Sequence, residues 1–183
     1  MVSVRKVFVA VCVLLCFAGA SFAADIALTS AGQSPDAMMV RVVLKKLGVE
    51  ADSDPLMKPE GLTQKILIVV IGGSSKGLGA AGIDKDQEIA RLSALLKAAA
   101  GKNVKILAMH VGGEGRRGKL SDEFITAVAP AADKLVVVEG GNADGIFTNL
   151  TKEKKTPIHG APNVSGVAAP LKEILAEWGI PAK

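Results

Sequence analysis

The chain has 183 residues, of which 49% are apolar and 22% are charged, and it contains two cysteines and no tyrosine. This balance excludes a disordered or collagen-like chain, and the length is that of one domain rather than several. A formal net charge of only +4 and an aromatic content of 3% exclude nucleic-acid binding, which needs a basic surface and stacking side chains.

The N-terminal residues 1–23 are predicted to be a cleavable signal peptide. Arg5 and Lys6 precede a short apolar stretch, and Ser21-Phe22-Ala23 places small residues at the two positions that signal peptidase reads. The stretch is shorter than the roughly 18 residues of a membrane span, so no span is expected after processing. Cleavage would lower the net charge from +4 to +2 and remove both cysteines. The product is expected to be periplasmic or extracellular and free of disulfides.

Residues 24–183 are predicted to form a single domain in which strands and helices alternate. In chain order, the strands are expected at residues 25–30, 66–71, 104–111, 135–138 and 157–159, the last at an edge. The helices are expected at residues 35–47, 85–101, 122–129, 142–150 and 170–178, the first three capped by Ser34, Asp84 and Ser121. Residues 49–64 are expected to be a looser connection.

This alternation predicts an α/β three-layer sandwich, Rossmann-like or flavodoxin-like, with helices on both faces of a mainly parallel sheet of about five strands. The strand order stays open. The continuous aliphatic run at residues 66–71 (ILIVVI) is typical of a parallel strand buried on both faces. Open sheets of this class bind ligands at the carboxyl ends of their strands. We therefore expect the site in the loops at residues 30–34, 72–82, 112–118 and 139–145.

The glycine-rich residues 72–82 (GGSSKGLGAAG) match more than one functional pattern. Residues 77–82 fit the dinucleotide fingerprint, and the whole segment is similar to the cofactor loop of short-chain dehydrogenases. That fingerprint, however, belongs directly after the first strand. The chain also lacks tyrosine, and therefore the catalytic tyrosine of those enzymes. A Walker loop is excluded because no Gly-Lys-Ser/Thr follows. No cofactor is expected.

A serine hydrolase is an alternative interpretation of the same segment. Ser75 is the centre of a Gly-x-Ser-x-Gly spacing, and Asp144 and His159 follow in the hydrolase order. The nucleophile elbow needs a helix directly after its serine, whereas residues 78–83 are expected to be a glycine–alanine loop. An enzymatic activity is therefore not the leading expectation.

The leading interpretation is an anion-binding nest, with a plain tight loop as the alternative. Consecutive glycine amides, two serine hydroxyls and the Lys76 ammonium would together hold a carboxylate or phosphate. Arg116 and Arg117 follow the third strand and can bind an oxyanion through two parallel N–H bonds, unless they form a solvated loop tip. The predicted ligand-binding residues are Ser30, Gln33, Ser34, Gly73, Ser74, Ser75, Lys76, His110, Glu114, Arg116, Arg117 and Asn142.

A metal site is not predicted. It would have to combine His110 and His159 with Glu114, Glu139 or Asp144, and no cysteine or helical histidine pair supports such a cluster.

Four segments carry a resemblance to a known family: residues 29–36 (TSAGQSPD), 71–84 (IGGSSKGLGAAGID), 110–118 (HVGGEGRRG) and 139–147. In these segments the chain resembles a family of exported bacterial proteins catalogued only as a domain of unknown function. The resemblance implies a bacterial origin, export and one α/β domain. It brings no assigned activity and no assigned site residues.

The sequence therefore predicts an exported, non-enzymatic module that binds a small anionic solute at the carboxyl edge of its sheet. The alternatives are a small hydrolase that uses Ser75 and a protein-interaction module without a small ligand. The interaction module would expose an apolar patch on a helix face. The oligomeric state is left open.

Processing gives the first test. Intact-mass analysis of the exported protein should show an N-terminus at Ala24 and no lipid, because the apolar stretch is too short to anchor the chain. A retained segment, or an acyl group on Cys16, would contradict this prediction.

Overall fold

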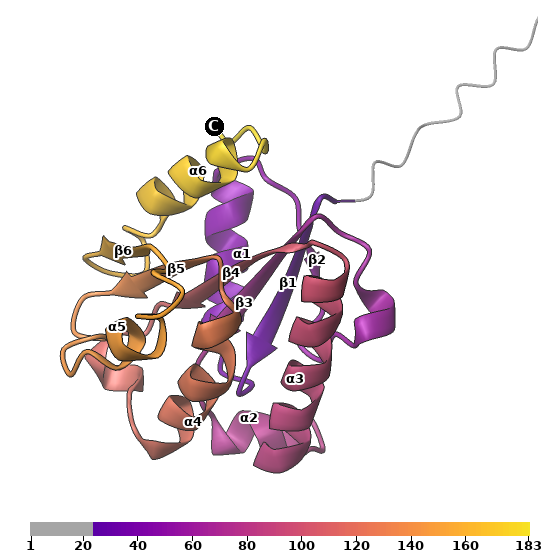
Figure 1. The fold of residues 1–183 in the computed structure, drawn as a ribbon, viewed down its shortest axis with the longest axis vertical. Helices are drawn as coiled ribbons and strands as arrows, with labels where there is room; N and C mark the ends of the chain where they lie inside the picture. The colour runs from indigo at the N-terminus through magenta and orange to yellow at the C-terminus, as the bar shows by residue number, and fades with distance from the viewer. Residues whose placement is uncertain (1–23) are drawn as a thin grey trace, which may run out of the picture.

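The computed structural model describes residues 24–183, so the predicted signal peptide lies outside the described residues. Six parallel strands form one sheet with the order β2-β1-β3-β4-β5-β6, and helices cover both of its faces (Figure 1). The strands are β1 (Ile26–Ala31), β2 (Asp52–Ser53), β3 (Ile66–Ile71), β4 (Lys105–His110), β5 (Lys134–Val138) and β6 (Ile158–Ala161). The predicted α/β sandwich is confirmed. The sheet has six strands rather than about five, because the two-residue β2 lies inside the predicted connection at residues 49–64.

The helices are α1 (Asp36–Lys46), α2 (Ser75–Ala80), α3 (Lys85–Gly101), α4 (Lys119–Val128), α5 (Ile146–Leu150) and α6 (Ala168–Glu177). Short 3-10 turns cover Pro59–Gly61, Glu114–Arg116 and Ala129–Ala131. Within residues 24–183, no helix is both long enough and apolar enough to cross a membrane.

The strand order resolves the topology that the sequence left open. The chain passes from β1 outward to β2, returns across β1 to β3, and then continues in one direction to β6. The first five strands therefore follow the flavodoxin order. The direction of winding reverses between β1 and β3, and the loops after these two strands lie where such sheets bind ligands.

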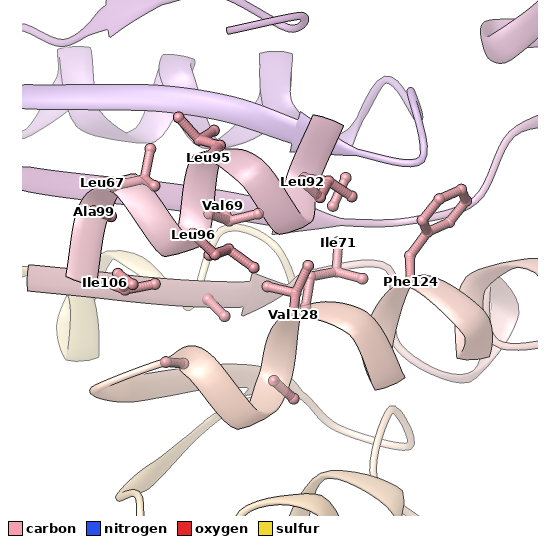
Figure 2. Close-up of a cluster of buried hydrophobic side chains, with 14 of the residues drawn as sticks. Leu67, Val69, Ile71, Leu92, Leu95, Leu96, Ala99, Ile106, Phe124 and Val128 are labelled. Atoms are coloured by element: carbon pink, nitrogen blue, oxygen red, sulfur yellow. The ribbon is translucent and has the colours of Figure 1, made fainter. Parts of the chain in front are cut away.

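Strand β3 anchors both layers of the core. All six of its side chains are buried, which accounts for the aliphatic run in the sequence. Alternate residues face opposite sides of the sheet. One set packs against α3 and α4 (Figure 2), where the labelled side chains are Leu67, Val69, Ile71, Leu92, Leu95, Leu96, Ala99, Ile106, Phe124 and Val128. The other set packs beneath α1 and α6, together with Val40, Leu44, Leu171 and Ile174.

Three local predictions are wrong. Ser34 is not the N-cap residue of α1, because that position is taken by Pro35; the Ser34 hydroxyl accepts a bond from the Asp36 amide at 3.3 Å. Residues 75–80 form helix α2 rather than a loop, because the Ser74 hydroxyl caps it by accepting a hydrogen bond from the Gly77 amide at 3.0 Å. Ser121 does not cap α4, which begins at Lys119. Ser121 is instead buried, and its hydroxyl accepts a bond from the Gly73 amide at 2.9 Å. The α2 correction comes from a helix cap, and the Ser121 correction comes from a contact between segments that are distant in the sequence.

Helix α2 packs tightly against the loop after β1. A methyl group built on Gly77 would lie 1.9 Å from the Gln33 carbonyl oxygen, whereas one built on Gly79 meets nothing within 4 Å. Glycine at position 77 therefore allows α2 and the β1 loop to approach each other closely.

This contrast gives a matched pair of variants. Gly77→Ala should lower the free energy of unfolding by about 1–3 kcal/mol, because the helix and the loop must move apart. Gly79→Ala, in the same helix, should raise it by about 0.5–1 kcal/mol through helix propensity. Urea denaturation measures both, and equal effects of the two substitutions would contradict the described packing.

Candidate functional site

The loops after β1 and β3 form one unit at the carboxyl edge of the sheet. Gln33 and Gly73 pair as an isolated antiparallel bridge. The Ser74 amide donates to the Gly32 carbonyl at 2.8 Å, and the Gly72 amide donates to the Ala31 carbonyl at 2.9 Å. Backbone hydrogen bonds therefore join the two loops at the place where the direction of winding reverses.

These contacts change what the glycine-rich loop can offer to an anion. The amides of Gly72, Gly73, Ser74 and Gly77 all donate to acceptors within the protein. The predicted nest of free amides is thus occupied by protein atoms. These four amides are therefore not free to bind an anion.

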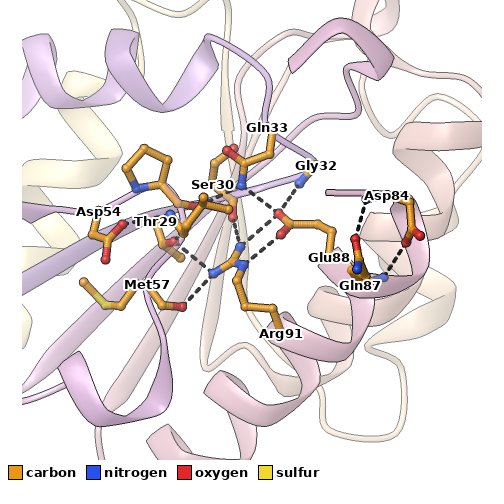
Figure 3. A network of polar contacts seen from close by, with 12 residues as sticks. Thr29, Ser30, Gly32, Gln33, Asp54, Met57, Asp84, Gln87, Glu88 and Arg91 are labelled. Carbon is orange, nitrogen blue, oxygen red and sulfur yellow. Dashed lines mark hydrogen bonds and ion pairs between the residues drawn. The ribbon is translucent and has the colours of Figure 1, made fainter. Parts of the chain in front are cut away.

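A buried ion pair on α3 supports the loop from below (Figure 3). Glu88 is fully buried, and its Oε1 accepts bonds from the Gly32 amide and from Gln33 Nε2, both at 3.0 Å. Arg91 Nε donates to Glu88 Oε2 at 2.7 Å. The pair therefore holds the loop after β1 through both its backbone and a side chain.

Arg91 also ties the end of β1 to the segment after β2. Its Nη2 donates to the Ser30 carbonyl at 2.6 Å, and its Nη1 donates to the Met57 carbonyl at 2.8 Å (Figure 3). The sequence analysis missed Glu88 and Arg91. The sequence held a signal for Glu88, because it lies four residues before Leu92 and therefore on the buried face of α3.

This frame borders a cleft of about 410 Å³, called here the β1 cleft. It is lined by Leu28, Thr29, Ser30, Gln33, Ser34, Pro35, Ala37, Met38, Ser53, Pro55, Ser74, Lys76, Gly77 and Ala80. Five of the predicted ligand-binding residues are among them: Ser30, Gln33, Ser34, Ser74 and Lys76. Lys76 is the only charged lining residue. Ser30 is 1% exposed, and its hydroxyl has no hydrogen-bond partner among residues 24–183.

Two further predicted residues, Glu114 and Arg116, line a second cleft of about 490 Å³, called here the β5 cleft. Its lining residues are Asp36, Met39, Val111, Gly112, Gly113, Glu114, Gly115, Arg116, Val138, Glu139, Pro162, Asn163 and Val164. Seven of the twelve predicted site residues are thus divided between two clefts, one on each side of the first turn of α1.

Arg117 has a structural role in the described residues. Its guanidinium binds both carboxylate oxygens of Asp144, at 2.9 and 2.7 Å, and also contacts Asp122 and the Gly141 carbonyl. These bonds, together with the Ile146 amide, lower the pKa of Asp144 from 3.8 to about 2. The stabilisation is present above the unfolded value of 3.8 and is lost only as pH falls toward 2.

His110 and Asn142 also make internal contacts. The fully buried His110 ring lies with Nδ1 3.1 Å from the Ile71 carbonyl and Nε2 3.0 Å from the Gly113 carbonyl. Asn142 accepts a bond from the Phe147 amide and donates one to Thr148. His110 therefore joins the end of β3 to the loop after β4, and Asn142 shapes the turn before α5.

The hydrolase candidates Ser75, Asp144 and His159 are not brought together. Helix α2 does begin at Ser75, as an elbow requires, but Asp144 is held by Arg117. His159 lies within the edge strand β6, in register through β5 and β4 with Val70 of β3. Three strand spacings separate β3 from β6, about 14 Å. Among residues 24–183, no group of three or more His, Cys, Asp or Glu side chains could hold a metal ion.

Comparison with known proteins gives one family and a distant structural likeness. A family model described as a domain of unknown function (DUF6305) matches residues 23–175. No curated protein matches the chain. The crystal structure of AlinE4, an SGNH-hydrolase family esterase, aligns at 14% identity with a TM-score of 0.31, covering 84% of this chain and 93% of that chain. A serine-to-alanine mutant of that esterase aligns at 14% identity over the same shares, with a TM-score of 0.29. At these TM-scores the likeness carries no argument.

The ion pair beneath the β1 cleft gives the third prediction. Arg91→Met should destabilise the protein by about 3–5 kcal/mol, because it leaves the Glu88 carboxylate buried without a cation. Glu177→Gln serves as control, since it breaks the ion pair with Lys134 at a half-exposed site and should cost at most about 1 kcal/mol. Chemical denaturation compares the two, and similar losses would contradict a central role for Glu88 and Arg91.

Proposed function

Because the chain belongs to the DUF6305 family, a domain family of unknown function, we propose its function from the site: an exported, non-enzymatic protein that binds a small organic anion in the β1 cleft. The ligand would carry one carboxylate or phosphate group on a short apolar body. The cleft volume of about 410 Å³ falls in the range of small-molecule sites.

The Ser30 hydroxyl is the observation that carries the proposal. It is buried and lines the cleft, yet it has no partner among the described residues. Leaving a buried polar group unpaired costs about 1–3 kcal/mol, and native proteins rarely do so without a reason. A ligand oxygen in the β1 cleft would supply the missing partner.

The charge of the cleft selects an anion. Lys76 is the only charged lining residue, and it makes no ion pair with another described residue. Leu28, Pro55 and Met38 supply apolar surface around it. A ligand with a charged end and a short hydrocarbon body matches this combination.

The frame around the cleft favours binding because it is already ordered. Gln33 is held by Glu88 and by the Pro55 carbonyl, and Thr29 lies within 3.4 Å of Arg91 Nη1. Side chains fixed in this way lose little entropy when a ligand arrives. Export is supported by the pattern of residues 1–23, in which a basic start, an apolar stretch and small residues at the cleavage positions follow one another.

A second candidate function is a protein-interaction module, because α1 exposes three large apolar side chains. Met38 is 57% exposed, Met39 46% and Val42 53%. Such a patch is the expectation for an interaction surface. Met38 also lines the β1 cleft, so in the leading proposal it contacts the ligand.

A thermal-shift experiment separates the two candidates. Inorganic phosphate, acetate, butyrate, hexanoate and butyl phosphate would be compared on the mature protein. Butyrate, hexanoate or butyl phosphate should raise the melting temperature more than acetate and inorganic phosphate, because a ligand that binds only the folded state stabilises it. If none of the five raises it, the interaction module becomes the better explanation.

Ser30→Ala gives the fourth prediction. It should raise the melting temperature of the empty protein, because it removes an unpaired buried hydroxyl, and should weaken binding of the best of these anions about two- to tenfold. The matched control is Ser121→Ala, which removes a buried hydroxyl that accepts from the Gly73 amide and should lower stability by about 1 kcal/mol. Two destabilised variants would argue against Ser30 as a ligand contact.

A further inference from the structure

The β5 cleft carries the opposite charge and has no part in the proposed function. Its ionisable lining residues are Asp36, Glu114, Glu139 and Arg116, so three carboxylates stand against one guanidinium. Val111, Val138 and Val164 add apolar surface. An excess of negative charge beside apolar side chains suits an organic cation.

Asp36 is the group in this cleft that lacks a partner. Its side chain is 2% exposed, and its Oδ2 has no hydrogen-bond donor among the described residues. That oxygen lies 3.0 and 3.2 Å from the positions that methyl groups on Gly72 and Gly112 would occupy. A carboxylate removed from water is costly unless a cation or several donors face it. The position in the first turn of α1 offsets part of this cost but supplies no bond to Oδ2.

In the part of the chain that the structure describes, Arg116 is the only cation paired with this carboxylate, and the contact is long. The distance from its Nε to Asp36 Oδ1 is 3.6 Å, beyond a hydrogen bond, and its side chain is 39% exposed. Its aliphatic stem lies over Gly112, where a methyl group would be 1.9 Å from Arg116 Cγ. Arg116 therefore covers Asp36 without satisfying it and can be displaced at a small cost.

We propose that the β5 cleft is a second binding site, which takes an organic cation: a primary ammonium on a short apolar body. The ammonium would replace Arg116 beside Asp36, and Glu114 and Glu139 would attract it at the rim. The hydrocarbon body would lie on the valines at the ends of β4 and β5. A metal ion is not the expected ligand, since the described residues include no group of three or more carboxylates or imidazoles placed to coordinate one.

Titration of the labelled protein with n-butylammonium, followed by amide NMR, locates the site. Saturable shifts are expected at Gly112, Gly113 and Gly115. Asp36→Asn should weaken binding at least about tenfold, because it removes the charged acceptor. Arg116→Ala should strengthen binding about two- to fivefold, because it removes a competing cation held by a half-exposed ion pair.

The controls make each outcome decisive. Glu153→Gln changes an exposed carboxylate outside the cleft and should leave binding unchanged. If Asp36→Asn does not fold, the double variant Glu114→Gln/Glu139→Gln should still weaken binding several-fold through the rim charge. The proposal is overturned if butylammonium causes no saturable shift, if Arg116→Ala weakens its binding, or if Mg²⁺ alone shifts the same amides. Because butyrate reports on the β1 cleft, failure of one site is distinguishable from failure of the other.

Discussion

The buried pair of Glu88 and Arg91 is the interaction on which the carboxyl edge of the sheet around β1 depends. A carboxylate without solvent exposure is tolerated only where donors surround it, and here they come from Gly32, Gln33 and Arg91 itself. The guanidinium then reaches the carbonyls of Ser30 and Met57. One pair on α3 thus fixes the end of β1, the loop after it and the segment after β2. The polar side chains that line the β1 cleft are held in place by the same contacts.

The first turn of α1 divides the carboxyl edge into two clefts of opposite charge. On one side, Lys76 is the only charged lining residue. On the other, three carboxylates face Arg116 alone. The two clefts lie at one edge because all six strands are parallel and send their following loops in the same direction. The small net charge of the chain is therefore compatible with a positive β1 cleft and a negative β5 cleft. Composition alone could not have shown this difference, because it does not place the charges.

Much of the fold could be predicted because its signals are local. The aliphatic run of β3 and the capping box of Asp84 and Gln87 follow from periodicity and spacing, and the structure has both. The same alternation correctly placed the loops at one edge of the sheet. The roles of Ser121 and Arg117 could not be predicted, because their partners Gly73, Asp144 and Gly141 lie 24 to 48 residues away. Helix α2 was missed because two of its six residues are glycines, and its Ser74 cap and its packing outweigh that low propensity.

Buried polar groups without partners give the physical link between this fold and a function. Glu88, His110, Ser121 and Thr151 are buried in the described residues, and all have acceptors or donors within the protein. Three side-chain atoms do not: Ser30 Oγ, Asp36 Oδ2 and His159 Nε2. His159 is on the edge strand β6, whereas Ser30 and Asp36 each line one of the two clefts. Because the fold pairs its other buried polar groups, these unpaired atoms stand out from the rest of the core. In the two proposals, these free atoms are the places where a bound ligand would stabilise the folded protein.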